Sequence, residues 1–335
     1  MAKIKIQGEI VIAYLDEFID IPTHTLAKKI YIENPEAFKS IETCRSVIRY
    51  YRGASGKANA KKSGAQKYKR KKGEPFGWNR LPDGEKEIDW LSPAIINCKL
   101  ALVLSDIHFP WHNKVALMAA LEHGYNKGVD VIYLNGDIMD AYQLSRYVND
   151  PRLRNFKEEL DLCRDFLYIL RSEFPDARIY FKIGNHEIRY EKYMMLKSPQ
   201  FLDIPYFSLE HILHFDDLDI QMIESHEWAN INGLPVLHGH EAGGSFYNPV
   251  NPARSVFLKM THSAIIGHHH QSSSHSSKNM LDEIIQCWST GCLCDLHPKY
   301  LAVNKWNIGF AEIEGVEEGY LVHNYRIHNK RIMNV

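Results

Sequence analysis

The sequence has no long apolar run, and this absence excludes a large class of proteins. No stretch of the 335 residues is apolar over the roughly 20 positions that a transmembrane helix needs. Residues 1–9 interrupt apolar with polar side chains and lack the apolar core of a signal peptide. We therefore expect a cytoplasmic protein with no membrane partner.

Cysteine is also sparse and scattered, which argues against a disulfide framework. Free thiols in a reducing cytoplasm explain such a distribution better than cross-linking does. Two cysteines form the block Cys292-Leu293-Cys294, which lacks the second pair of a zinc site and is predicted to be a half-buried strand. The six cysteines are Cys44, Cys98, Cys163, Cys287, Cys292 and Cys294.

The chain is long enough for one large domain and a small one, and its charge is unevenly placed. Hydrophobic residues make up 45% and charged residues 24%, which is ordinary for a globular protein with a sizeable core. The net charge is −1. Residues 49–72, however, hold ten Lys or Arg and no Asp or Glu, which leaves 30 basic against 41 acidic residues elsewhere. A basic segment on an acidic body suggests an arm for a polyanion.

Residues 1–52 are predicted to form a small helical unit. Apolar residues recur at helical spacing after Thr23, which is expected to cap a helix, and Asn34-Pro35 ends that helix. A second helix with arginines near its end is predicted to start at Ser40. A helix, a break and a basic second helix are consistent with a DNA-binding helix-turn-helix, although paired amphipathic helices occur in many folds.

Residues 53–98 are predicted to be a basic linker and connector. The first part is rich in Gly, Ser, Ala and Lys, as flexible tethers are. Trp78 and Trp90 are expected to pack on the domain that follows. The basic side chains either keep the tether soluble or contact phosphates without regard to base sequence. The candidate DNA contacts are Arg45, Arg49, Arg52, Lys61, Lys62, Lys67, Lys69, Arg70, Lys71 and Lys72.

Residues 99–335 alternate strand-like with helix-like segments, which predicts an α/β domain. In open sheets of this kind, sites form at the carboxyl ends of the strands. The predicted strands are 100–104, 129–134, 178–183 and 234–237, the predicted helices are 115–121 and 156–174, and 308–313 with 320–327 is expected to be a closing hairpin.

Five short blocks with metal-binding side chains follow apolar runs in this domain. Together they offer carboxylates, a carboxamide and imidazoles, a mixed oxygen and nitrogen set that suits borderline transition metals. Two such ions about 3.5–4 Å apart form sites that split phosphate esters. The blocks are Asp106-Ile107-His108, Gly136-Asp137, Gly184-Asn185-His186-Glu187, His238-Gly239-His240 and Gly267-His268-His269-His270.

These blocks, in this order, resemble those of the calcineurin-like metallophosphoesterases over residues 99–315. The resemblance implies a two-sheet αββα sandwich and two divalent metal ions. Manganese is the expected ion, with iron, zinc and nickel as alternatives. By the family pattern, Asp106, His108 and His270 would hold one ion. Asn185, His238 and His268 would hold the other, Asp137 would bridge both, and a hydroxide between the ions would attack phosphorus.

The resemblance also assigns a catalytic role to His186, which would protonate the leaving oxygen or stabilise the transition state. Asp140 matches the acidic residue that orients this histidine in the protein-phosphatase branch, although an aspartate after a strand also caps helices. That branch has arginines where this chain has Ala141 and Ile183.

The missing arginines weaken the expectation of a phosphoprotein substrate, because arginine grips phosphate with two prongs. Arg146 and Arg189 lie close in sequence and either replace them or are ordinary surface residues. Residues 136–146 and 184–190 also resemble metallophosphoesterases from phage genomes, some of which carry a helix-turn-helix-like unit ahead of the catalytic domain.

Three functions remain open at this point. A dimetal phosphodiesterase or nuclease that acts on DNA uses both the basic arm and the metal site. A phosphomonoesterase acting on nucleotides or phosphoproteins would use the arm only as a tether. A DNA-binding regulator would keep the metallo-domain as a non-catalytic scaffold, which the intact ligand set argues against. The first function is favoured, and the oligomeric state is not predicted.

Overall fold

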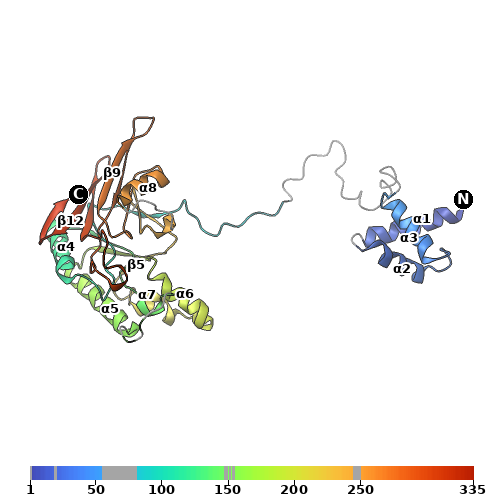
Figure 1. Ribbon diagram of the computed structural model, residues 1–335, viewed down its shortest axis with the longest axis horizontal. Coiled ribbons are helices and arrows are strands. Elements are labelled where there is room, and N and C mark those ends of the chain that lie inside the picture. Colours follow the sequence, from blue (N-terminus) through green and yellow to red (C-terminus); the bar gives the residue numbers. More distant parts are fainter. Residues whose placement is uncertain are drawn as a thin grey trace. The chain divides into compact units, whose positions relative to one another are not determined.

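A computed structural model describes residues 2–18, 21–54, 81–146, 150, 152, 155–243 and 250–335. The chain divides into two compact units, Met1–Glu85 and Lys86–Val335, which are drawn in Figure 1. Each unit has its own hydrophobic core. None of the helices in these ranges is both long enough and apolar enough to cross a bilayer.

The first unit is a bundle of short helices around a small apolar core. Leu26, Ile30 and Ile48 are fully buried in this core. Val11 and Leu15, one helical turn apart, contribute to it from a first helix that the sequence analysis does not predict. The helices are α1 (Ala2–Glu17), α2 (Thr23–Glu33) and α3 (Ile41–Tyr51).

Side-chain hydrogen bonds fix the helix ends in this unit. Ser40 begins α3 as predicted, because its hydroxyl accepts a hydrogen bond from the Thr43 amide at 3.2 Å. The prediction that Thr23 caps α2 is wrong, since Pro22 occupies the cap position and Thr23 is the first helical residue. The Thr23 hydroxyl instead accepts from the Arg52 guanidinium at 2.8 Å, which ties the end of α3 to the start of α2.

Two β-sheets form the middle of the second unit. In the described residues, one sheet has the strand order β13 (Arg331–Asn334), β12 (Gly319–His328), β11 (Gly309–Val316), β2 (Leu100–Leu104), β3 (Val131–Asn135), β4 (Arg178–Lys182) and β5 (Ile220–Ile223). The other has the order β1 (Ala94–Ile96), β6 (Ala229–Ile231), β7 (Leu234–Leu237), β8 (Ala264–Ile266), β10 (Ile284–Ser289) and β9 (Ser273–Lys278). Strands β2 to β5 run parallel, so their carboxyl ends meet at one edge.

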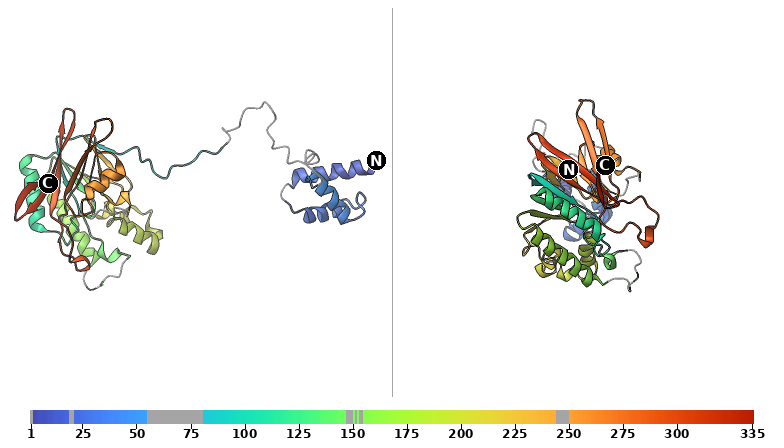
Figure 2. Two further views of the ribbon diagram at one scale, coloured as in Figure 1. Left: turned by 45° about the horizontal axis from the view of Figure 1, so that its top comes forward. Right: turned by 90° about the vertical axis from the view of Figure 1, so that its left-hand side faces the viewer.

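Helices cover the outer faces of both sheets. Helices α4 (Lys114–Lys127) and α5 (Phe156–Glu173) pack on the first sheet, and α8 (Pro252–Met260) packs on the second, as Figure 2 shows. A separate buried cluster, with Val103 and Tyr133 from one sheet and Leu234 and Ile265 from the other, fills the space between them. The predicted αββα sandwich is therefore confirmed.

Short helices and turns connect these layers. Helix α6 follows directly on the Gly-Asn-His-Glu block, so it begins at the edge where the parallel strands end. The connecting elements are η4 (Tyr142–Leu144), α6 (Ile188–Lys197), η5 (Pro199–Phe201), η6 (Pro205–Phe207), α7 (Leu209–Ile212), η7 (His240–Ala242) and η8 (Lys299–Leu301).

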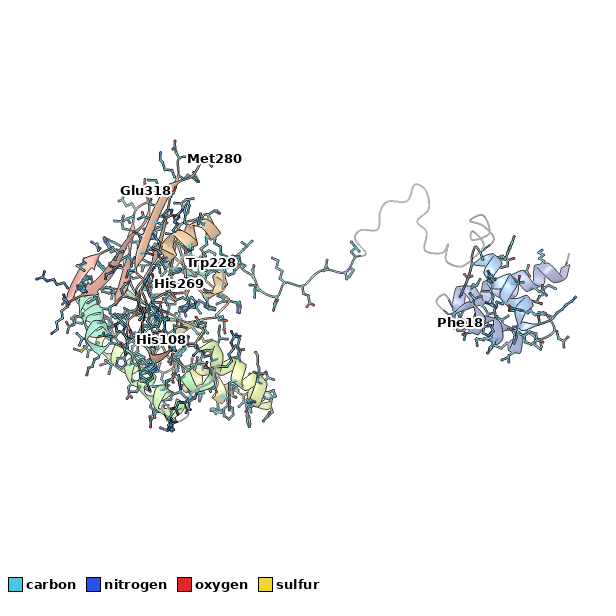
Figure 3. All side chains as sticks on the ribbon, in the orientation of Figure 1. Phe18, His108, Trp228, His269, Met280 and Glu318 are labelled. Carbon is cyan, nitrogen blue, oxygen red and sulfur yellow. The ribbon has the colours of Figure 1, made fainter. Side chains whose placement is uncertain are left out.

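Several predicted boundaries agree with the structure, and one helix extends well beyond its prediction. The predicted strands 100–104 and 234–237 coincide with β2 and β7, and the closing hairpin is β11 paired with β12. Helix α4 continues to Gly128, whose left-handed φ of 70° ends it. Figure 3 labels Met280 and Glu318 at the turns of the β9–β10 and β11–β12 hairpins.

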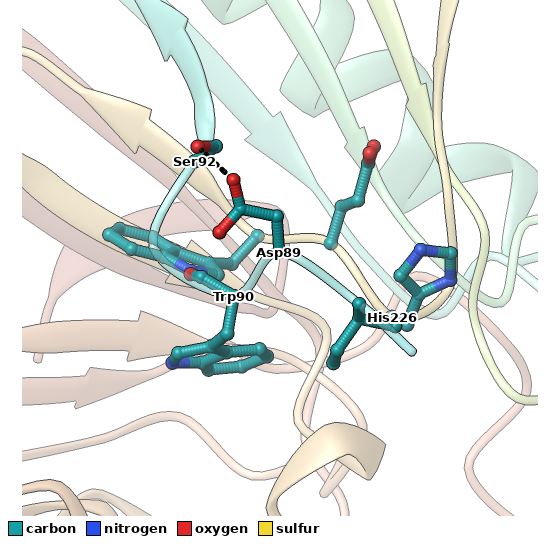
Figure 4. A pocket seen from close by; sticks show the side chains of 7 residues that line it. Asp89, Trp90, Ser92 and His226 are labelled. Atoms are coloured by element: carbon teal, nitrogen blue, oxygen red, sulfur yellow. Dashed lines mark hydrogen bonds between the residues drawn. The ribbon is translucent and has the colours of Figure 1, made fainter. Parts of the chain in front are cut away.

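The last part of the predicted connector packs on the sandwich. Strand β1 pairs in parallel with β6 and so extends the second sheet. Trp90 lies 6.2 Å from Trp228 between ring centroids, and its carbonyl accepts a hydrogen bond from the Trp228 indole. Packing of Trp90 was expected, whereas Trp78 lies outside the described residues. Figure 4 shows the cavity of about 140 Å³ beside this pair, with Asp89 on its wall.

Candidate metal centre

The five blocks lie in loops that directly follow β2, β3, β4, β7 and β8, as predicted from the sequence. Most of the expected ligands in these loops have left-handed backbone angles that L-residues rarely adopt. Such a conformation costs about 1–2 kcal/mol per residue and clusters at functional sites. The φ angles are 56° at Asp106, 51° at His108, 53° at Asp137, 66° at His268 and 55° at His270.

Asp106, His108 and His270 converge on one point. The Nε2 atom of His270 lies 3.2 Å from Oδ1 of Asp106 and 3.3 Å from Nε2 of His108. The other carboxylate oxygen of Asp106 accepts hydrogen bonds from the Ser105 hydroxyl at 2.7 Å and the His268 amide at 2.8 Å. Oδ1 is buried and has no hydrogen-bond partner among the described residues. A divalent cation fits this set, because it would satisfy that oxygen.

A second group forms around Asp137, His238 and Asn185. The Nε2 atom of His238 lies 3.3 Å from Oδ2 of Asp137 and 3.2 Å from Oδ1 of Asn185. His238 donates its Nδ1 proton to the Asn135 carbonyl at 2.7 Å, so its Nε2 atom faces the group. His268 belongs to the same cluster, with ligand atoms of Asp137, His238 and His268 within 4.8 Å of one another.

Asp137 lies between the two groups. Its Oδ2 atom is 3.3 Å from His238 on one side and 3.9 Å from Nε2 of His108 on the other. Its Oδ1 atom accepts a hydrogen bond from the His186 amide at 2.9 Å, which fixes the carboxylate plane. Asp137 is thus placed where the sequence analysis expects a carboxylate shared by two cations.

Buried charges in the two groups depend on each other. Burial alone would lower the pKa of His238, but the Asp137 carboxylate beside it raises that pKa to about 10. Likewise, Asp106 overcomes the effect of burial and raises the pKa of His270 to about 10. Burial and the nearby His238 lower the pKa of His268 to about 3. Cations that bind here would displace protons from the first two imidazoles, since metal ligands must be deprotonated.

His186 stands next to these groups, and one of its ring nitrogens lies within 4.8 Å of ligand atoms of His108 and Asp137. Its Nδ1 atom donates to the Asp140 carbonyl at 2.7 Å and lies 3.0 Å from the Asp140 carboxylate. Its Nε2 atom lies 3.7 Å from Oδ2 of Asp137 and 2.9 Å from Nη2 of Arg189. Asp140 also contacts Nδ1 of His108 at 3.2 Å, so one carboxylate orients two imidazoles.

The structure separates the two arginines that were predicted as substrate contacts. Arg189 is at the site, because it donates to His186 and, at 2.8 Å, to the Asp140 carbonyl. Arg146 is exposed at the end of the loop after η4, and its role stays a prediction. Ala141 is buried and Ile183 is 7% exposed, so the arginines of the protein-phosphatase branch have no counterpart at those two positions.

Glu187 is a residue whose role the sequence analysis missed. Its buried carboxylate accepts hydrogen bonds from the amides of Asp137, Ile138 and Met139 at 2.7–3.0 Å. It also accepts from the Gly184 amide at 2.9 Å. The two loops after β3 and β4 are therefore fastened to one side chain. A glutamate directly after the Asn-His pair was the available signal.

A buried ion pair supports the His238 loop, and it was also missed. The Lys182 ammonium is fully buried and lies 3.1 Å from Oε1 of Glu241. It donates further hydrogen bonds to the carbonyls of Glu224 and Ser225 at 2.8 and 2.9 Å. Glu241 accepts from the amides of His238 and Gly239. A charged residue at the end of an apolar strand was the signal for this pair.

The predicted half-buried strand at residues 292–294 is wrong. Cys292, Leu293 and Cys294 are fully or almost fully buried, and the two cysteines make only isolated bridges. The Cys294 sulfur lies 3.8 Å from Nδ1 of His270, and ligand atoms of His108, His270 and Cys294 fall within 4.8 Å of one another. This block is buried beside Asp106, His108 and His270, where Cys294 contacts His270.

Three of the ten residues predicted to contact DNA lie in the described part of the chain. Arg45 pairs with Glu42 at 2.7 Å, Arg52 makes the helix contact described above, and Arg49 is exposed on α3. The remaining candidates lie outside the described residues and stay predictions: Lys61, Lys62, Lys67, Lys69, Arg70, Lys71 and Lys72.

Comparison with known proteins adds to this geometry. Gene 54 protein of Mycobacterium phage L5 is 26% identical over 180 residues, which cover 52% of this chain and 69% of that protein. Vacuolar protein sorting 29 from Cryptosporidium parvum matches with a TM-score of 0.40 and 11% identity, over 71% of this chain and 96% of its own. A dimetal phosphatase from Danio rerio matches with a TM-score of 0.36 and 12% identity, over 70% of this chain and 96% of its own.

The family model of the calcineurin-like phosphoesterases matches residues 100–300, which contain all five blocks. The family binds two divalent metal ions, and the two side-chain groups around Asp137 are the candidate ligands here. The chain therefore belongs to the calcineurin-like phosphoesterase family, a family of metal-dependent hydrolases.

Proposed function

We propose that this protein is a dimetal phosphodiesterase that cuts DNA. The observation that supports it most is the convergence of two ligand groups on the shared carboxylate of Asp137, beside an oriented His186. Two divalent ions in such groups supply an activated water and neutralise the charge of a phosphate ester. Manganese suits the oxygen and imidazole donors, and iron, zinc and nickel are the alternatives.

The residues of this chain would bind the phosphate and assist departure of the leaving group. The Arg189 guanidinium, 2.9 Å from His186, offers its donors to phosphate oxygens. His186 would carry the proton for the leaving oxygen on Nε2 once Arg189 has turned from that nitrogen to the phosphate, while Asp140 holds the Nδ1 side in place. Asp140 thereby orients His186 through the nitrogen that does not take part in the proton transfer.

DNA as the substrate is proposed on the distribution of charge. Residues 49–72 hold ten cationic side chains and no acidic ones. Such a segment binds phosphate chains without sequence preference, and its affinity falls steeply with salt. The cytoplasm is proposed as the place where the protein meets this DNA. The helical unit, with Arg49 exposed on α3, is proposed to add contacts.

The test is a substrate panel with purified full-length protein and manganese. The panel holds single-stranded DNA, duplex DNA, bis-p-nitrophenyl phosphate and p-nitrophenyl phosphate, and Asp106→Asn is assayed in parallel to detect contaminating nucleases. We expect cleavage of DNA and of the small diester. Cleavage of the monoester alone would indicate the phosphomonoesterase alternative, and bound metal without any turnover would indicate the regulator.

A variant in the full chain tests the role of the basic segment. Serine at the seven positions Lys61, Lys62, Lys67, Lys69, Arg70, Lys71 and Lys72 should lower DNA cleavage at least tenfold at 0.15 M salt, because phosphate contacts dominate such binding. The rate on bis-p-nitrophenyl phosphate should stay unchanged. Equal loss on both substrates would contradict a role limited to DNA binding.

A further inference from the structure

The loop of residues 295–307 is fastened beside the first metal group. The Asn304 side-chain amide donates to the carbonyls of Leu296 at 2.6 Å and Leu301 at 2.8 Å. The Asn307 amide donates to the His270 carbonyl at 2.9 Å. These bonds hold the loop, with its η8 turn, at a fixed place next to His270.

Two aromatic residues of this loop extend outward from the metal ligands. The Trp306 ring lies on His270 with 4.0 Å between centroids. The Tyr300 ring meets Trp306 edge to face, with 6.4 Å between centroids and 67° between planes. Trp306 thus packs between His270 and Tyr300, so the two aromatic rings form a continuous contact that begins at an expected ligand.

Tyr300 is 78% exposed, so its aromatic side chain is not part of the hydrophobic core. Its hydroxyl end is nevertheless within electrostatic reach of the site. Partial burial of that end and the charge of Asp140 raise the pKa of Tyr300 to about 12, while Arg189 has the opposite effect. The hydroxyl therefore keeps its proton at neutral pH, and most of the side chain faces solvent.

We propose that the exposed ring of Tyr300 is a stacking platform for the nucleobase next to the scissile phosphate. This inference rests on the proposed phosphodiesterase function and names the recognised group. A phosphate held beside His270 places an attached nucleoside within reach of Tyr300, because Tyr300 packs on Trp306 and Trp306 packs on His270. An aromatic face binds any unstacked base, since every base offers a π-face, but it gains nothing from a duplex whose bases are already stacked.

The choice of ligand follows from the surroundings of the ring. Trp306 and Tyr300 offer flat apolar faces, whereas Arg189, beside His186, offers the donors that a phosphate needs. An alkyl ester would leave the ring exposed, and an inorganic phosphate would not reach it. A flat heterocycle joined to the phosphate by a sugar contacts both the aromatic faces and the groups that bind phosphate. Unpaired nucleotides are therefore the substrate class that fits.

The test compares two diesters that share one leaving group. Thymidine 5′-(p-nitrophenyl phosphate) carries a base, and methyl p-nitrophenyl phosphate does not. We expect the full-length enzyme to prefer the thymidine ester at least fivefold in kcat/KM. Tyr300→Ala and Tyr300→Leu should bring the ratio close to one, and Tyr300→Phe, which keeps the ring, should retain it. Tyr125→Ala, at an exposed tyrosine on α4, is the matched control.

A binding measurement separates this proposal from the proposed function. Calorimetric titration of the manganese-loaded protein with thymidine 5′-monophosphate and with inorganic phosphate gives an affinity ratio that needs no turnover. If neither diester is cleaved but Tyr300→Ala lowers this ratio, the phosphodiesterase proposal fails and the platform stands. If Tyr300→Ala leaves both ratios unchanged, or Tyr300→Phe loses them as fully as Tyr300→Ala, the platform is refuted.

Discussion

At the scale of single residues, we expect His186 to serve the reaction without holding a metal. Both of its ring nitrogens have defined neighbours, Asp140 at Nδ1 and Arg189 at Nε2. One of these nitrogens also lies within 4.8 Å of ligand atoms of His108 and Asp137, so a mutation has to separate the proposed role in the chemistry from metal binding.

Replacing His186 by alanine should therefore lower kcat and leave metal binding intact. We expect kcat on bis-p-nitrophenyl phosphate to fall by about 10²–10⁴-fold, the range for loss of a general acid. Manganese affinity, measured by calorimetric titration, should change less than threefold. His211→Ala, at an exposed histidine on α7, is the control. Parallel loss of metal affinity and kcat would show that His186 is a ligand.

Glu241 is a second residue whose charge state has a measurable consequence. Burial would raise the pKa of its carboxyl group, but Lys182, with help from His240, holds that pKa at about 2, below the ordinary value of 4.5. A depressed carboxyl pKa stabilises the fold above the unfolded-state value, and this stabilisation is lost as the pH falls from about 4.5 toward 2.

The stability of the wild type should accordingly fall more steeply than that of Glu241→Gln between pH 5 and about 3, since the amide does not titrate. Urea midpoints followed by circular dichroism give the two profiles. Parallel profiles would contradict an ionised Glu241 in the folded protein. Asp295→Asn, at an exposed acid, controls for general acid effects.

At the scale of elements, the site depends on a strand that ends in a buried charged residue. Strand β4 ends in Lys182, which is buried with hydrogen bonds to the turn after β5 and an ion pair to the turn after β7. Three elements are thus joined at one ammonium group. Its removal leaves the Glu241 carboxylate buried without its cation.

Lys182→Met should destabilise the protein by about 3–5 kcal/mol, the cost of breaking a buried ion pair. Lys127→Met, at the exposed end of α4, should stay within about 0.5 kcal/mol of the wild type. Urea unfolding measures both. The double variant Lys182→Met with Glu241→Gln should recover part of the loss, because no unpaired charge remains. No recovery would mean that Lys182 acts only through its carbonyl contacts.

The element scale also explains what the sequence could and could not predict. The strand-loop pattern predicted β2, β7 and the α/β layers. The seven expected ligands came from the family resemblance, and the structure brings their side chains into the two groups around Asp137, while their roles as ligands stay predictions. Helix α1 was missed because residues 10–15 are a continuous apolar run, which has no helical periodicity. Glu187, Lys182 and Cys294 were missed for another reason, because their partners come from distant loops and only the fold brings them together.

At the scale of the whole molecule, the two units have separate cores, and within the described residues the ligand groups lie in Lys86–Val335 alone. Metal that binds the folded state stabilises it by mass action, by about 2.7 kcal/mol at a hundredfold excess over Kd. The helical unit has no share in that binding among its described residues.

Calorimetry of the full chain should therefore resolve two unfolding transitions, of which only one shifts upward with manganese. Removal of metal with a chelator should return that transition to its starting temperature. Asp137→Asn, which alters the carboxylate common to both groups, should abolish the shift. A shift of both transitions would show that the two cores do not unfold independently.

The four amide contacts of Glu187 bear on how this enzyme is loaded with ions. Since one carboxylate already braces the loops after β3 and β4, the chelating cage is preorganised, and the incoming cations need not reshape it. Ion exchange would then be governed by dehydration and entry rather than by refolding. Which cation occupies the protein would consequently follow the metal supply of its surroundings, as expected for a rigid scaffold.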